Sequence, residues 1–346
     1  MNVSAVEFLL LGTGAFVLTG ILTWPVRKVA LWIGAMDLPN IGRKTQKEAV
    51  PYLGGISIAA SICILTYSAI YVADNTTTTF PLVNYLLLPA VAMGLMGLVD
   101  DLRGLEPWPR LLFQTLIGAV VAIIMVKNQL TGSPTGNEIL DNALFVIWIV
   151  GITNSINFFD NLDGGAAGTV AISCLGISFI AYSQAQESVM ALAFVTASAC
   201  AGFLLWNKSP AKIYMGDAGA LFLGVVVSLL TIRLNPGIEP KWRSLALLPI
   251  LLAVPILDTC IAVFSRLRRG ISPFQGGRDH LSHRLMRKGL AKKNAAYTLW
   301  AMQAGFVACA VSIYQWPQSC GIQLFVATST IWLAAFIWFW HIPSSD

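Results

Sequence analysis

The chain has 346 residues, of which 56% are hydrophobic and only 11% are charged. Soluble globular domains carry about 25% charged residues, so this composition is typical of a protein embedded in a membrane. It excludes an intrinsically disordered chain, which needs many charges and few apolar residues. It also excludes a disulfide-rich secreted domain, because the six cysteines are sparse and none form a CxxC pair.

Apolar runs recur along the sequence, each near the ~20 residues that a helix needs to cross the membrane. The runs are continuous rather than alternating, which favours helices over a β-barrel. The first run is followed by Trp24-Pro25-Val26-Arg27-Lys28 instead of a cleavage site, so it is interpreted as a retained span. The sequence predicts an all-α bundle, one domain over residues 1–346, with about eleven transmembrane helices near 6–24, 54–73, 84–99, 110–126, 140–156, 165–183, 188–206, 217–232, 244–264, 296–314 and 321–340.

The basic residues predict the orientation of this bundle. With the N-terminus outside, 18 of the 22 Lys and Arg residues lie in inward loops. Basic residues gather in cytoplasmic loops, so we expect the N-terminus outside and the C-terminus in the cytoplasm. The net charge of +5 then reflects topology and requires no nucleic-acid partner. The cytoplasmic loops are expected near residues 25–53, 99–110, 156–165, 206–217 and 265–295.

Acidic residues gather at the same face. A carboxylate at the centre of a membrane helix costs roughly 2.5–3.5 kcal/mol, so acids at or beside the ends of membrane helices indicate a function. Their position on one side of the membrane predicts one cytoplasmic-face site built from several loops. The acids concerned are Asp100, Asp101, Asp160, Asp163, Asp217, Asp258 and Asp279.

Two of the acidic segments suit a cation. Asp100 and Asp101 end the third predicted span, where adjacent carboxylates repel unless a cation or proton holds them. Asn157, Asp160 and Asp163 follow each other at i,i+3 spacing, which would place three oxygen-bearing side chains on one helix face. The alternatives are a solvated helix end for the Asp pair and a helix cap for Asp163.

Two further segments carry candidate residues at the same face. Asp217 is expected near a helix N-terminus, a place that favours anions, and nearby Tyr214 could stack on a base. The alternative for Asp217 is an N-cap. His280 and His283 lie in the longest inward loop among basic residues, where the alternative is a positively charged membrane anchor. Two His residues without a neighbouring Cys are too few ligands for zinc.

Taken together and in this order, the segments resemble the polyprenyl-phosphate N-acetylhexosamine-1-phosphate transferase family. The resemblance runs from Pro51-Tyr52-Leu53-Gly54-Gly55 to about Leu290. It implies a UDP-N-acetyl sugar donor, a polyprenyl phosphate acceptor, Mg²⁺ (or Mn²⁺) and UMP as leaving product. It also implies an integral protein of the bacterial cytoplasmic membrane with its active site facing the cytoplasm, acting at the first membrane step of cell-envelope polysaccharide synthesis.

The resemblance also implies residue roles. Asp217 would be a metal ligand together with Asp100 and Asp101, which would orient or deprotonate the lipid phosphate, with Asp100 the preferred base. An Asp nucleophile in a double displacement is the alternative. His280 and His283 would contact the diphosphate. The expected substrate-binding residues are Asn157, Asp160 and Asp163 for nucleotide or sugar, Asn207 and Tyr214 for uridine, and the basic residues Lys47, Arg278 and Arg284.

The sequence departs from the family pattern in places. Ser282 stands where a His is common and Asn161 where Gly is usual, and Asp279 lies closer to the His residues than usual. These departures do not affect the residues expected to act in phosphotransfer, but they leave the identity of the donor sugar undetermined. Pro255-Ile256-Leu257-Asp258 and the eleven spans favour the N-acetylglucosamine branch over the muropeptide transferase of peptidoglycan synthesis.

Other interpretations fit less well. A transporter would place polar residues near the bilayer midplane, whereas these acids lie at one face. A CDP-alcohol phosphotransferase would carry a compact acidic run that is absent. Asp258, deep in an apolar run, is expected to support the site by holding the ninth span against the His loop, with a buried tie to another helix as the alternative. A homodimer is a further expectation.

Overall fold

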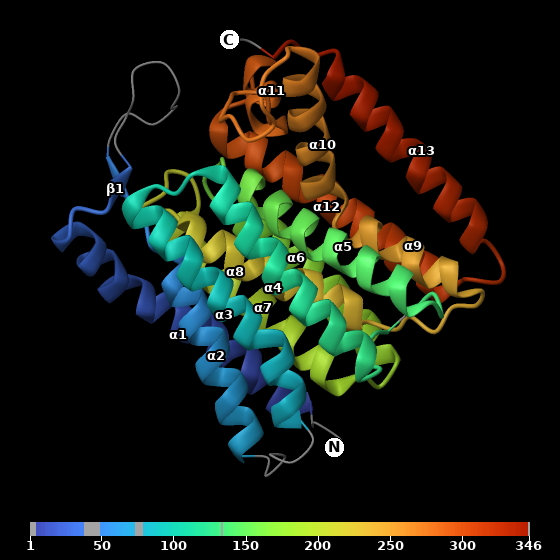
Figure 1. Ribbon diagram of the computed structural model, residues 1–346. Helices are drawn as coiled ribbons and strands as arrows, with labels where there is room; N and C mark the ends of the chain where they lie inside the picture. The colour runs from blue at the N-terminus through green and yellow to red at the C-terminus, as the bar shows by residue number, and fades with distance from the viewer. Residues whose placement is uncertain (1–4, 38–48, 73–78, 133, 345–346) are drawn as a thin grey trace.

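The computed structural model describes residues 5–37, 49–72, 79–132 and 134–344. Helices make up most of it and strands very little, which confirms the predicted all-α class (Figure 1). A two-residue antiparallel pair joins β1 (Met36–Asp37) to β2 (Val50–Pro51). The helices are α1 (Ala5–Trp32), α2 (Gly55–Val72), α3 (Thr79–Arg103), α4 (Pro107–Lys127), α5 (Glu138–Phe159), α6 (Gly165–Ser183), α7 (Glu187–Asn207), α8 (Gly216–Arg233), α9 (Lys241–Leu251), α10 (Ala253–Arg268), α11 (Leu281–Arg287), α12 (Lys292–Gln315) and α13 (Gly321–Trp340).

The described residues contain ten helices long and apolar enough to cross a membrane, and eleven spans if α9 and α10 together form one. The predicted number of about eleven spans agrees with this count when α9 and α10 are taken as one span. The expectation of a single helix over 244–264 is wrong, because α9 and α10 meet at an angle of 72°.

Proline chemistry explains the break between α9 and α10. Pro255 has no N–H, so the carbonyl of Leu251 four residues earlier lacks its helical partner. The buried amide of Gln303 on α12 replaces the missing contacts: its Nε2 donates to the Leu251 carbonyl at 2.8 Å, and its Oε1 accepts from the Val254 N–H at 3.0 Å. A broken span is thus kept hydrogen-bonded inside the protein, as an apolar surrounding requires.

The centre of the bundle is α8, whose residues from Ala218 to Ile232 are all buried. Helices α2, α3, α5, α6 and α7 pack around it. Helix α1 begins and α13 ends at opposite ends of the bundle, and the hairpin, α11 and the end of α10 share the end at which α8 begins (Figure 1). Which end faces the cytoplasm stays a prediction.

Candidate active site

The aspartates of α3 and α8 meet where α8 begins. The two helices approach closely because Gly97 carries no side chain: a Cβ there would lie 2.4 Å from the backbone oxygen of Asp217. This contact sets Asp100 and Asp101, one turn further along α3, beside the first turn of α8. Residues more than a hundred positions apart therefore form one acidic centre.

Asp101 caps α8. Its two carboxylate oxygens accept the backbone N–H groups of Asp217 at 2.9 Å and Ala218 at 3.0 Å. Those N–H groups have no partner inside the helix, and an anion suits their positive end. The interpretation of Asp217 as the N-cap is therefore wrong, because Asp217 lies inside α8. Asp101 differs from the other two predicted metal ligands because both its oxygens accept backbone N–H groups of α8.

Asp217 faces α4 and α5. Its Oδ1 accepts from Asn157 Nδ2 at 2.8 Å, and its Oδ2 accepts from Arg110 Nη1 at 3.2 Å. The same Arg110 nitrogen pairs closely with Asp100 Oδ2. Asp100 is buried, and its Oδ1 accepts the Leu105 N–H at 2.7 Å. One guanidinium thus bridges two of the three carboxylates that the sequence predicted as metal ligands.

The loop between α5 and α6 holds Asp163 firmly. Its carboxylate pairs with Lys292 Nζ at 2.6 Å and accepts the Ala211 N–H at 3.2 Å. Lys292 begins α12, and its ammonium also lies 5.9 Å from the ring centre of Tyr214. Asp163 therefore joins three segments, and the alternative of a local helix cap is wrong, because Gly164 is the N-cap of α6.

Asp160 differs from its neighbours. Among the described residues, no hydrogen bond or ion pair holds its carboxylate. Burial, reinforced by the carboxylates of Asp217, Asp101 and Asp163, raises the pKa of Asp160 to about 8. A cation arriving here would favour its ionised form.

Asn207 and Tyr214 shape the loop that precedes α8. Buried Asn207 donates to the Ile213 carbonyl at 2.9 Å and accepts the Gly164 N–H at 3.0 Å, so its amide ties two loops together. Tyr214 hydrogen-bonds to Asp163, and burial with the nearby carboxylates raises the pKa of its phenol. Both lie beside the acidic centre, but the Asn207 amide already contacts backbone.

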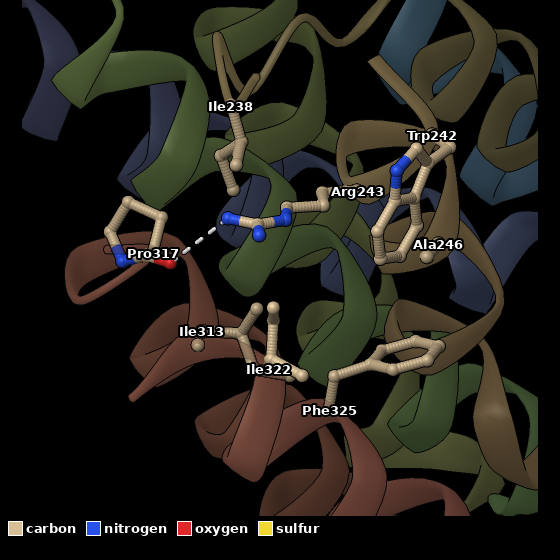
Figure 2. A pocket seen from close by; sticks show the side chains of 9 residues that line it. Ile238, Trp242, Arg243, Ala246, Ile313, Pro317, Ile322 and Phe325 are labelled. Atoms are coloured by element: carbon tan, nitrogen blue, oxygen red, sulfur yellow. Dashed lines mark hydrogen bonds between the residues drawn. The ribbon is translucent and has the colours of Figure 1, made fainter. Parts of the chain in front are cut away.

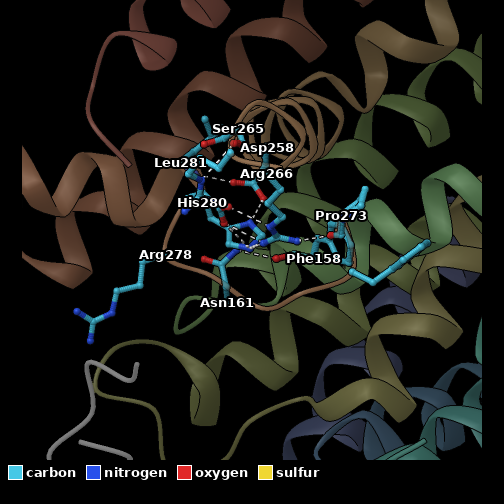
Figure 3. Close-up of polar contacts among 12 residues, drawn as sticks. Phe158, Asn161, Asp258, Ser265, Arg266, Pro273, Arg278, His280 and Leu281 are labelled. Atoms are coloured by element: carbon cyan, nitrogen blue, oxygen red, sulfur yellow. Dashed lines mark hydrogen bonds and ion pairs between the residues drawn. The ribbon is translucent and has the colours of Figure 1, made fainter. Parts of the chain in front are cut away.

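Arg266 organises the loop that carries the His residues (Figure 3). Its guanidinium donates to both oxygens of Asp279, at 3.0 and 2.8 Å, and lies 5.3 Å from the Phe158 ring centre. Arg269 pairs with the same Asp279 at 2.7 Å. Burial opposes ionisation of Asp279, but Arg266 and His280 hold its pKa below the usual range. This network fixes the loop against the end of α5.

Both ring nitrogens of His280 have protein partners. Nε2 faces Arg266 Nη2 at 3.0 Å, and Nδ1 faces Asp258 Oδ2 at 2.7 Å. Arginine can only donate, so Nε2 accepts and the Nδ1–H donates to Asp258. Asp258 also accepts the Leu281 N–H at 2.7 Å, which provides the predicted tie between the ninth span and the His loop.

The other predicted site residues of this loop, Arg278, His283 and Arg284, do not lie together in one place. Arg284 is 1% exposed and donates to the carbonyls of Asp279 and Phe339, at 2.9 and 2.8 Å, so it anchors the end of α13 instead of facing open space. Arg278 points away from the buried network (Figure 3). His283 is half-buried, and burial with the nearby charges lowers its pKa to about 4.

Two departures from the family pattern contact each other. Ser282 Oγ donates to Asn161 Oδ1 in a short hydrogen bond, and Asn161 Nδ2 donates to the Phe158 carbonyl at 2.7 Å. The pair links the aspartate loop (residues 160–164, between α5 and α6) to helix α11, which begins after His280 and contains His283. The sequence showed both residues but gave no sign that they meet.

The donor set at Asp100 and Asp217 fits Mg²⁺. The described residues hold no cluster of three or more His, Cys, Asp or Glu that could hold a metal ion by itself. Mg²⁺ does not require one, because it commonly takes one or two carboxylates and completes its shell with water and substrate phosphates. The two carboxylates lie close together, because both pair with the same nitrogen, Arg110 Nη1.

Sequence reasoning missed Arg110, Lys292 and Arg266 as site residues and counted them only as signs of topology. A base within the first turn of a predicted span, as at Arg110, was the available signal. Lys47 lies outside the described residues.

A pocket at the opposite end of the bundle is unrelated to this site (Figure 2). It lies between α9, α12 and α13, and Arg243 donates across it to the Pro317 carbonyl at 3.3 Å. Its cavity of about 20 Å³ has room for roughly one water molecule.

Comparison with known proteins agrees with this geometry. Residues 83–235, which include Asp100, Asn157 and Asp217, match the model of glycosyl transferase family 4. The chain is 30% identical over 325 residues to the probable undecaprenyl-phosphate N-acetylglucosaminyl 1-phosphate transferase of Bacillus subtilis, covering 92% of this chain and 85% of that one. The chain belongs to glycosyl transferase family 4.

Two further relatives are similar over most of their length. The decaprenyl-phosphate N-acetylglucosaminephosphotransferase of Mycobacterium tuberculosis is 30% identical over 337 residues, which cover 87% of this chain and 81% of the relative. The undecaprenyl-phosphate alpha-N-acetylglucosaminyl 1-phosphate transferase of Escherichia coli is 27% identical over 315 residues, or 85% and 80% of the two chains. The family recognised from the sequence is confirmed.

Proposed function

We propose that the protein transfers N-acetylglucosamine 1-phosphate from UDP-N-acetylglucosamine to a polyprenyl phosphate, releasing UMP. The observation that carries the proposal is the convergence of Asp100, Asp160, Asp163 and Asp217 at one end of a membrane bundle of this family. The names of its relatives favour N-acetylglucosamine as the sugar. The product, a polyprenyl-diphosphate sugar, would begin a cell-envelope polysaccharide.

The position of the acidic centre suits one substrate that is embedded in the membrane and one that is dissolved in water. A lipid phosphate lies at the membrane boundary, whereas a sugar nucleotide arrives from water, and α8 begins where these two regions meet. We place this end of the bundle at the cytoplasmic face of the bacterial inner membrane, because the inward loops carry most of the basic residues. A homodimer remains a prediction.

The proposed reaction is a single displacement. An oxygen of the lipid phosphate bonds to the β-phosphorus of the donor, and the bond from that phosphorus to the bridging oxygen breaks, so UMP leaves with the bridging oxygen. Mg²⁺, when bound, would offset the negative charge of the phosphates. Asp100 and Asp217 would hold it, Asn157 donates to Asp217 and orients it, and the phenol ring of Tyr214 would stack on the uracil.

The test is a transfer assay with purified protein. Radiolabelled UDP-N-acetylglucosamine and undecaprenyl phosphate should give lipid-linked label with one UMP per transfer, and chelation should stop the reaction until Mg²⁺ is restored. UDP-N-acetylgalactosamine and UDP-N-acetylmuramoyl-pentapeptide test the sugar. Transfer from the pentapeptide donor alone would identify a peptidoglycan enzyme, and lipid-linked label from none of the three donors would refute the transferase.

A further inference from the structure

One nitrogen of Arg110 occupies the space between two carboxylates. Its Nη1 lies 3.2 Å from Asp217 Oδ2 and makes a still shorter contact with Asp100 Oδ2. Two carboxylates that share one nitrogen repel each other unless a cation lies between them, and in the described residues Arg110 alone pairs with both.

Arg110 is held less firmly than the structural arginines of the protein. Arg266 and Arg284 are 2% and 1% exposed, and each uses all three guanidinium nitrogens in hydrogen bonds. The Arg110 side chain is 18% exposed, and within the described residues only its Nη1 forms hydrogen bonds. Its other nitrogens make none with described parts of the chain, so leaving the carboxylates would cost Arg110 few contacts.

The charge balance favours a replacement for this guanidinium. Asp163 is paired with Lys292, and Asp101 accepts two backbone N–H groups, which leaves Asp100 and Asp217 sharing one directly paired cation in the described residues. A divalent cation at the same oxygens would supply two charges where the guanidinium supplies one. It would also release a planar donor group beside the phosphates that the site is proposed to bind, and arginine matches phosphate geometry well.

We propose that Arg110 is an exchangeable counter-ion. In the absence of substrate its guanidinium neutralises Asp100 and Asp217, a divalent cation displaces it from those oxygens, and the displaced side chain then donates to the substrate phosphates. The backbone of Arg110 stays close throughout, because the Leu105 N–H binds Asp100 Oδ1 and holds the loop before α4. The exchange itself depends only on the two carboxylates, whereas the contact with phosphate rests on the proposed function.

Mn²⁺ binding without substrates tests the exchange. Purified wild-type protein, Arg110→Ala and Arg103→Ala would be titrated with Mn²⁺ by electron paramagnetic resonance. Arg103 is an exposed base at the same end of the bundle, so its removal controls for a general loss of positive charge. Arg110→Ala should lower the Mn²⁺ dissociation constant by about fivefold or more, and Arg103→Ala by less than twofold.

The two halves of the proposal predict opposite effects of one substitution. Arg110→Ala should bind Mn²⁺ more tightly and yet raise the KM for undecaprenyl phosphate or the donor about tenfold or more. Unchanged or weaker Mn²⁺ binding in a variant with a normal melting curve would overturn the exchange, and unchanged KM values would overturn the phosphate contact.

Arg110→Gln replaces Arg110→Ala in both measurements if the Ala variant does not fold. If the Arg110 variant binds Mn²⁺ more tightly but the wild-type protein transfers no sugar, the exchange is supported and the proposed function is refuted.

Discussion

At the scale of single residues, the carboxylates of the site differ in how many protein donors they already have. Asp101 accepts two backbone N–H groups, Asp163 has an ammonium and an N–H, and Asp160 has no such partner among the described residues. Asp217 lies between these cases, held by one amide and one shared guanidinium. Carboxylates with few or exchangeable partners are the ones available to a cation or a substrate.

Asp217→Asn tests this distinction. The amide oxygen can still accept from Asn157, but the variant loses the negative charge, so turnover should fall by about 100-fold or more while folding is kept. Transfer assays and thermal melting in detergent measure the two effects. Asp141→Asn is the matched control, since this buried acid lies at the start of α5, far from the site, and should keep near-normal turnover. Near-normal turnover in Asp217→Asn would reduce Asp217 to a packing role.

His283 predicts a pH dependence of stability. Burial, His280, Arg287 and Arg278 lower its pKa to about 4, against the partial opposition of Asp258, whereas the unfolded chain titrates near pH 6.5. Between these values the unfolded state binds more protons, so His283 makes the protein lose stability as the pH falls from 6.5 towards 4. The melting temperature of the wild type should therefore drop further between pH 7 and pH 5 than that of His283→Gln. Equal drops would show that His283 protonates freely in the folded protein.

At the scale of elements, loops far apart in the sequence are joined by few side-chain contacts. The link between Ser282 on α11 and Asn161 after α5 is one, and it sets the aspartate loop against the His loop. The Gln303 amide on α12 is another, because it supports the break between α9 and α10. Each connects elements whose backbones do not pair with one another.

A double-mutant cycle measures the first of these links. Ser282→Ala and Asn161→Ala should each lower the transfer rate about three- to tenfold, and Asn161→Ala should lose the more because it also removes the hydrogen bond to the Phe158 carbonyl. The double variant should lose little more than Asn161→Ala, because the Ser282–Asn161 hydrogen bond is already absent there. Ser282→Thr keeps the hydroxyl and should restore much of the rate. Additive losses would show that the two residues act independently.

The sequence predicted the elements of this fold better than their contacts. Long apolar runs are local signals, so ten spans and the segment of the broken one were visible in it. The 72° bend was not, since Pro255 permits a break but the compensating Gln303 lies 48 residues later. The acidic site was predicted as a cluster because charges avoid the membrane. Its internal roles were not, because side-chain direction decides that Asp101 caps α8 and that Arg110 bridges two acids.

At the scale of the whole molecule, the site lies at the end of the bundle where α8 begins. Helix α8 runs from the site at Gly216 to Arg233 at the far end, and α12 runs in the same sense from Lys292 to Gln315. The turn between α12 and α13 therefore lies at the end away from the site. Cys320 sits in that turn, whereas the other cysteines lie within helices α2, α6, α7, α10 and α12.

Cys320 is accordingly a natural reporter of orientation. If the site faces the cytoplasm, a membrane-impermeant maleimide should label Cys320 in intact spheroplasts, and Cys320→Ser should abolish that signal. Lys288→Cys in the Cys320→Ser background places a thiol at an exposed position beside the His loop, and it should be labelled only after permeabilisation. Sonicated membranes, which expose both faces, give the reference level for each thiol. Labelling of the Lys288→Cys thiol in intact spheroplasts, with Cys320 labelled only after permeabilisation, would reverse the orientation and place the acidic site outside the cell, out of reach of cytoplasmic sugar nucleotides.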